Sequence, residues 1–104
     1  MAVPFDPHFI DILMPDLVGH DRSPAAFLVY LYLWRRLSLT SRGSVQLSYA
    51  TMALETGLSK PSVQRAVTHL KRRGLLSVKT ESATSVPHYA IQRPWVGRLK
   101  AGAP

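Results

Sequence analysis

The chain has 104 residues, a length that fits a single domain, and 46% of them are apolar, which is enough for a packed core. It contains no cysteine, so neither a disulfide framework nor a thiolate metal site can stabilise it. The N-terminal segment is acidic and rich in proline, unlike a secretory signal, and the longest apolar run, residues 25–34, is too short to span a bilayer. We therefore expect a cytoplasmic protein without a membrane partner.

The charge is distributed unevenly along the chain. The net charge is +7, but residues 1–21 carry −4, while residues 22–104 hold all 13 Lys and Arg and only two carboxylates, a net +11. Such a basic body suits the phosphate backbone of a nucleic acid, and the alternative is a soluble basic protein without such a partner.

In chain order, three prolines divide the acidic N-terminal arm, residues 1–22, into short apolar pieces, for which we predict a short strand or a turn. Ser23-Pro24 then has the form of an N-cap followed by proline in the first helical turn, and a helix should run to about Leu39. This helix is apolar on more than one stripe, so we expect the arm or a second subunit to cover part of it.

Two shorter helices should follow a turn over residues 40–44 and a short strand over residues 45–47. Ser48 is the expected cap of the first, Tyr49–Thr56, which Gly57 ends because glycine adopts positive φ readily. Ser59 is the expected cap of the second, which runs to Arg73 and is closed by Gly74.

Alternating apolar residues predict one strand over about residues 76–81 and a return strand over residues 86–93, joined by a turn at residues 82–85. Pro94 should end this hairpin. The expected organisation is an acidic arm (1–22), a folded domain (23–94) and a basic, flexible C-terminal tail (95–104).

This order of elements resembles the winged helix-turn-helix domain of bacterial regulators such as the GntR and MarR families, over about residues 24–93. The most specific part is residues 52–76, MALETGLSKPSVQRAVTHLKRRGLL, with Ala53 at the helix contact, Gly57 in the turn and Ser59 at the cap of the recognition helix. The resemblance implies an α+β, mainly helical fold with a three-helix core, a short strand and a two-stranded β-hairpin wing. It also implies a transcriptional regulator, in particular a repressor, that binds double-stranded DNA and is not an enzyme.

The third helix has two distinct faces at 3.6 residues per turn. Val63, Ala66, Val67 and Leu70 form one apolar stripe, and the opposite face is polar and free to enter the major groove. We expect Arg65 and Gln64 to contact base edges, while the basic end of the helix contacts phosphates. The complete set of candidate DNA-binding residues is Ser48, Ser59, Lys60, Ser62, Gln64, Arg65, Thr68, His69, Lys71, Arg72, Arg73, Lys79, Ser82, Thr84 and Ser85.

The predicted wing has no basic residue at its tip, which reads Ser82-Ala83-Thr84-Ser85. Glu81 beside this tip would repel a phosphate, so insertion of a cation into the minor groove is not expected. The hydroxyl groups could still donate hydrogen bonds to phosphate oxygens.

Other functions have less support in the sequence. The four histidines are scattered, so no metal site is predicted, and no phosphate-binding loop, nucleophile elbow or cofactor motif is present. Two alternatives remain, the DNA-binding module of a plasmid or phage replication initiator and a winged helix that serves as a protein-interaction adaptor.

The acidic arm leaves two possibilities open. It could bind the basic body of its own or a neighbouring subunit, or it could be a frayed terminus. In the first case we expect a homodimer, whose recognition helices would lie about 34 Å apart and would match a palindromic operator.

Overall fold

The computed structural model describes residues 5–96, which fold around three α-helices and a small antiparallel sheet. The α-helices are α1 (Pro24–Ser38), α2 (Tyr49–Thr56) and α3 (Lys60–Arg72). The strands are β1 (Val45–Gln46), β2 (Leu76–Lys79) and β3 (His88–Ile91), with β3 paired to both of the others. This is the mainly helical α+β fold of a winged helix-turn-helix domain, as the sequence predicts.

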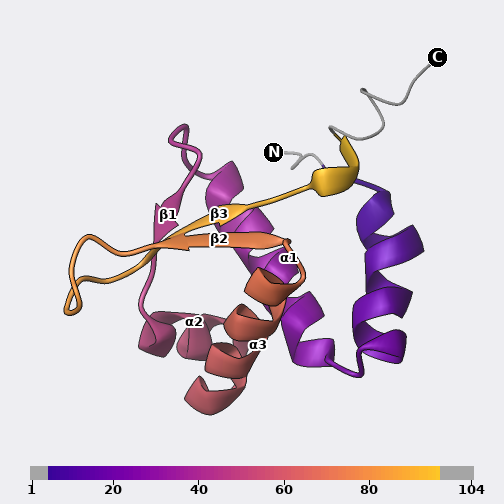
Figure 1. Ribbon diagram of the computed structural model, residues 1–104, viewed down its shortest axis with the longest axis horizontal. Coiled ribbons are helices and arrows are strands. Elements are labelled where there is room, and N and C mark those ends of the chain that lie inside the picture. Colours follow the sequence, from indigo (N-terminus) through magenta and orange to yellow (C-terminus); the bar gives the residue numbers. More distant parts are fainter. Residues whose placement is uncertain (1–4, 97–104) are drawn as a thin grey trace.

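The wing extends from one end of the molecule and the arm lies at the other (Figure 1). The register of the sheet places Val78 opposite Tyr89 on β3, and Val45 on β1 pairs with the same residue from the other side. Tyr89 is fully buried and fixes the wing to the core. The strands of the wing are shorter than predicted. β2 ends at Lys79 and β3 begins at His88, the residue that pairs with Lys79.

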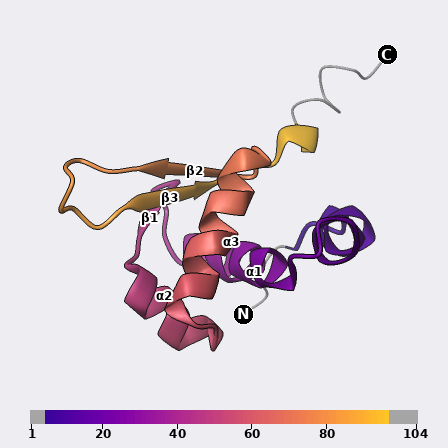
Figure 2. The same cartoon turned by 60° about the horizontal axis from the view of Figure 1, so that its bottom comes forward.

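The arm is helical, and the predicted short strand or turn is wrong. Two π-helical segments, η1 (Phe9–Leu13) and η2 (Pro15–His20), pack beside α1, and Figure 2 shows them nearly end-on next to this helix. The backbone N–H of Met14 donates to the carbonyl of Phe9, an i→i+5 bond that widens the turn beyond 3.6 residues. Residues spaced by four therefore share one face, and Phe9, Leu13 and Leu17 are all buried.

The arm covers the side of α1 that the sequence leaves without a partner. The ring of Phe9 meets those of Tyr30 and Trp34 edge to face, with centroids 5.2 and 5.0 Å apart. Trp95, which the sequence-based boundaries place in the tail, stacks on His8 at 4.0 Å. Residues 1–4 and 97–104, the start of the arm and most of the tail, lie outside the described residues.

One hydrophobic core runs through the arm, the three α-helices and the sheet. The side of α3 that faces α1 contributes the apolar stripe that its periodicity predicts. The buried residues are Phe9, Leu13, Leu17, Ala26, Phe27, Val29, Tyr30, Leu33, Leu47, Met52, Val63, Ala66, Val67, Leu70, Leu75, Leu76 and Tyr89. Because η1 and η2 contribute to this core, the arm is a structural part of the domain.

We predict that Leu17→Ala lowers the free energy of unfolding by about 2–5 kcal/mol, because it leaves a cavity beneath the arm. Leu54→Ala, the same change at a position of α2 that is 84% exposed, should stay within about 0.5 kcal/mol of the unsubstituted protein. Urea unfolding followed by tryptophan fluorescence measures both. Equal stability of the two variants would mean that the arm does not pack in solution.

Candidate nucleic-acid interface

Local capping interactions determine where α2 and α3 begin and how short the turn between them is. The Ser48 hydroxyl accepts a hydrogen bond from the backbone N–H of Thr51 at 3.1 Å, and the Ser59 hydroxyl accepts one from that of Ser62 at 3.2 Å. Between the helices, Gly57 has a φ of 82°, which a residue with a side chain rarely adopts. The sequence therefore ends α2 and starts α3 within three residues, as a helix-turn-helix requires.

The outward side of α3 is open to solvent. It borders a shallow hollow of about 470 Å³ that Ser23 closes on the side of α1. The hollow holds cationic and neutral polar groups and no carboxylate; its lining is Ser23, Pro61, Gln64, Arg65, Thr68, His69 and Arg72. Among the described residues, this surface therefore combines exposed hydrogen-bond donors with positive charge.

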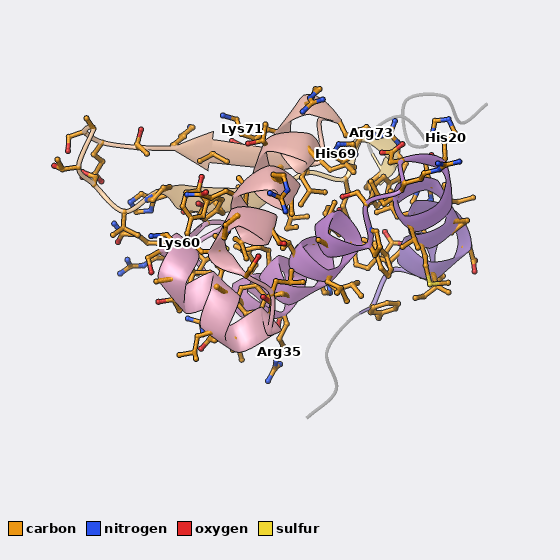
Figure 3. The ribbon with its side chains drawn as sticks, turned by 90° about the horizontal axis from the view of Figure 1, so that it is seen from below. His20, Arg35, Lys60, His69, Lys71 and Arg73 are labelled. Atoms are coloured by element: carbon orange, nitrogen blue, oxygen red, sulfur yellow. The ribbon has the colours of Figure 1, made fainter. Side chains whose placement is uncertain are left out.

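Most of the predicted contact residues on α3 are exposed. These are Lys60, Gln64, Arg65, Thr68, Lys71 and Arg72. Arg65 extends along the helix, with its Nη2 atom 3.4 Å from the Ser62 hydroxyl, and the Thr68 hydroxyl donates to the carbonyl of Gln64 at 3.0 Å. Lys60 and Lys71 lie at opposite ends of α3, so there is a positive charge at each end of the polar face (Figure 3).

Two predicted DNA-binding residues, His69 and Arg73, instead contact the arm. His69 is half-buried, and its Nε2 lies 2.7 Å from Oδ2 of Asp21, so this nitrogen carries the proton that the carboxylate accepts. Arg73 forms an ion pair with Asp21, with Nε 3.1 Å from Oδ2, and its Nη2 donates a hydrogen bond to Asp16. His20 joins the same cluster, where the end of the arm meets the end of α3 (Figure 3).

The charge of Asp21 is central to this cluster. Its side chain is only 7% exposed, and it accepts hydrogen bonds from His20 and His69 in addition to the ion pair with Arg73. These hydrogen bonds, reinforced by the nearby guanidinium, hold the pKa of Asp21 below its ordinary value of 3.8, although burial acts in the opposite direction. The carboxylate is therefore ionised when the arm is docked.

The histidines are less scattered than the sequence suggests, because His20 and His69 meet at Asp21. Asp16, His20 and Asp21 bring one potential metal ligand each within 4.8 Å of one another. The guanidinium of Arg73, however, lies against both carboxylates and already neutralises part of their charge. The geometry is that of an ion-pair cluster that joins the arm to α3.

The wing offers mainly uncharged groups. Lys79 is exposed at the end of β2, and among the tip residues Ser82 and Thr84 are exposed while Ser85 is half-buried. The Ser82 hydroxyl lies 2.7 Å from that of Ser85 and 3.4 Å from that of Thr84, so the tip hydroxyls pair with one another.

Sequence reasoning missed the residues that join the arm to α1. Arg22 and Ser23 lie beside the first turns of α3, and the acidic residues Asp16 and Asp21 dock on its last turn. The uneven charge distribution was the available signal, since an acidic arm next to a basic body predicts attraction without naming the pairs.

Comparison with known proteins identifies the family. A family model described as a helix-turn-helix domain matches residues 23–76, just over half of the chain and the segment that contains all three α-helices. The chain belongs to this helix-turn-helix family, which supports DNA binding in general and DNA as a partner. No curated protein and no solved structure matches it. The finer resemblance to GntR and MarR regulators stays a prediction.

None of the helices within residues 5–96 has the length and apolar character needed to cross a membrane.

We predict that Asp21→Asn lowers the free energy of unfolding at pH 7 by about 1–2 kcal/mol, because it weakens hydrogen bonds to a charged acceptor. A depressed folded-state pKa stabilises the protein above the ordinary value of 3.8, and this contribution is lost as the pH falls through the folded pKa. Urea unfolding between pH 7 and pH 2 should therefore show a smaller loss of stability on acidification for the variant. Asp11→Asn, at an exposed arm residue, is the control and should match the unsubstituted protein.

Proposed function

We propose that this protein is a small transcriptional regulator, acting as a repressor, that binds specific duplex DNA with α3 in the major groove. The observation that carries the proposal is the solvent-open polar side of α3, with exposed cations and no carboxylate in its hollow. Such a surface matches the negative charge of the duplex backbone, and a helix of this kind fits the major groove. We place the protein in the cytoplasm, at the nucleoid when bound, and propose no enzymatic activity.

The contacts divide by position along α3. Arg65 and Gln64 lie on the exposed side in its middle, where a guanidinium can pair with guanine and an amide with adenine. Lys60, Ser62 and Thr68 flank them, and Lys71 and Arg72 at the end of the helix bind phosphates.

The remaining candidates have secondary roles in this proposal. Ser48 and Ser59 position the helices through their capping bonds, and His69 and Arg73 hold the arm in place. In the wing, Lys79 is the one charged candidate, and Ser82, Thr84 and Ser85 add uncharged hydrogen bonds to phosphate oxygens.

We predict that affinity for a duplex falls steeply with salt, with a log–log slope of about −0.9 for each phosphate contact. Arg65→Ala should cost about 1–3 kcal/mol on the preferred sequence and relax the preference at one base pair, whereas Arg72→Ala should weaken all duplexes alike. Selection of bound duplexes from a random pool, followed by fluorescence anisotropy titrations, measures both effects. A salt-independent complex would favour the adaptor alternative, and equal losses on every duplex for Arg65→Ala would remove its base-reading role.

We further propose that the protein is a homodimer joined through the outer side of the arm. Ile10, Met14 and Val18 are 41, 38 and 37% exposed, and their spacing of four places them on one side of the π-helical segments. Residues 1–21 hold four carboxylates and no Lys or Arg, so this side is unsuited to DNA. A second copy would bury the apolar stripe and supply the symmetry of a palindromic site.

We predict that Met14→Glu halves the particle mass in solution, because it places a charge in the proposed apolar contact. Leu54→Glu is the matched control, since Leu54 is 84% exposed on α2, and its mass should not change. Sedimentation equilibrium across a range of concentrations measures the masses. The dimer proposal fails if the unsubstituted protein is already monomeric at every concentration.

A further inference from the structure

The turn between the arm and α1 contains an arginine that the fold holds in an unfavourable conformation. Arg22 has a φ of 54°, and it is the one residue other than glycine with positive φ among residues 5–96. L-residues with a Cβ rarely adopt this region. The surrounding contacts must therefore fix the backbone at this position.

Contacts on both sides of Arg22 fix it. On one side, the carboxylate of Asp21 is bound to His69 and Arg73 of α3. On the other, the backbone N–H of Ser23 donates to the carbonyl of Leu17 at 2.8 Å, and the Ser23 hydroxyl caps α1. The acidic cluster therefore determines where Arg22 lies relative to α3.

Arg22 borders a second hollow, of about 190 Å³, beside the first turns of α3. Ser62 and Arg65 line the opposite side, and no carboxylate contributes to the lining. Ser23 and Arg65 also line the hollow along the outward face of α3, so the two hollows adjoin at these side chains. The arm–α1 turn and the start of α3 both lie along the lower edge of the molecule in Figure 1.

The side chain of Arg22 is exposed and makes no hydrogen bond or ion pair within the part of the chain that the structure describes. An unpaired guanidinium, a hydroxyl and a second guanidinium around one hollow are the donor groups that a phosphate diester accepts from. We infer that Arg22 is a further DNA-binding residue, which binds a backbone phosphate in this hollow beside the bases that face Arg65. This inference rests on the proposed DNA-binding function of α3.

The backbone of Arg22 allows a test in which stability and binding change in opposite directions. Arg22→Gly removes the guanidinium and also relieves the positive φ, so the melting temperature should stay the same or rise. Affinity for a labelled 30-base-pair duplex of random sequence should fall roughly tenfold, with a log–log salt slope smaller in magnitude by about 0.9. A residue with only a structural role would not produce this combination.

Three further variants complete the experiment. Arg22→Asn also removes the charge, and asparagine tolerates positive φ, so it should repeat the loss of affinity. Arg22→Lys should restore most of the salt slope because it keeps the charge. Arg35→Ala removes an exposed cation about 17 Å further along α1, at a rise of 1.5 Å per residue, and should leave the slope unchanged.

The possible outcomes separate the inference from the function on which it rests. Loss of affinity for the Gly and Asn variants, with stability kept, supports the inference. If the unsubstituted protein binds the duplex and Arg22→Gly binds with the same affinity and slope, the inference alone is wrong. If the unsubstituted protein shows no salt-dependent binding to any duplex, the proposed function fails and the inference fails with it.

Discussion

The apolar surface of α1 is the constraint on which the rest of the structure depends. Its side chains are apolar on more than one side, so one neighbouring helix cannot cover them in a domain of this size. The stripe of α3 covers one side, and the arm covers another through Phe9, Leu13 and Leu17. Because the apolar stripe of α3 packs against α1, α2 and β2, its polar side faces solvent, and the arm ends beside its last turn.

In this arrangement the charged residues of α3 have two different roles. At the end of the helix, Asp16 and Asp21 balance Arg73 and hold His69, so those side chains join the arm to the domain. Further along the outward side, Arg65 and Arg72 have no carboxylate in their hollow. The acidic arm therefore reduces the positive charge only where the fold needs a contact and leaves it intact where the proposed duplex would lie.

The sequence predicted the helix-turn-helix because its signals are local. Ser48, Gly57 and Ser59 each act within a few residues, and the observed bounds of α2 and α3 follow them closely. The arm could not be predicted in the same way. Its burial follows a spacing of four in a π-helix, and its ion pairs with the end of α3 join side chains that are 48 to 57 positions apart in the sequence, which no local pattern encodes. The same limit explains why Arg22 was missed, since only the docked arm places it beside α3.

The uncharged tip of the wing and the charged turn at Arg22 both affect where a duplex would be bound. A winged helix with a basic tip can bind the duplex through its wing as well as through its recognition helix. Here the tip is uncharged, and its hydroxyls pair with one another. The charges near α3 instead lie at its two ends, at Arg65 in its middle and in the arm–α1 turn, so electrostatic attraction would centre on α3 itself. Discrimination between sequences would then depend on how firmly α3 is held. The arm contributes to that directly, because it anchors the last turn of α3 and covers the helix on which α3 packs.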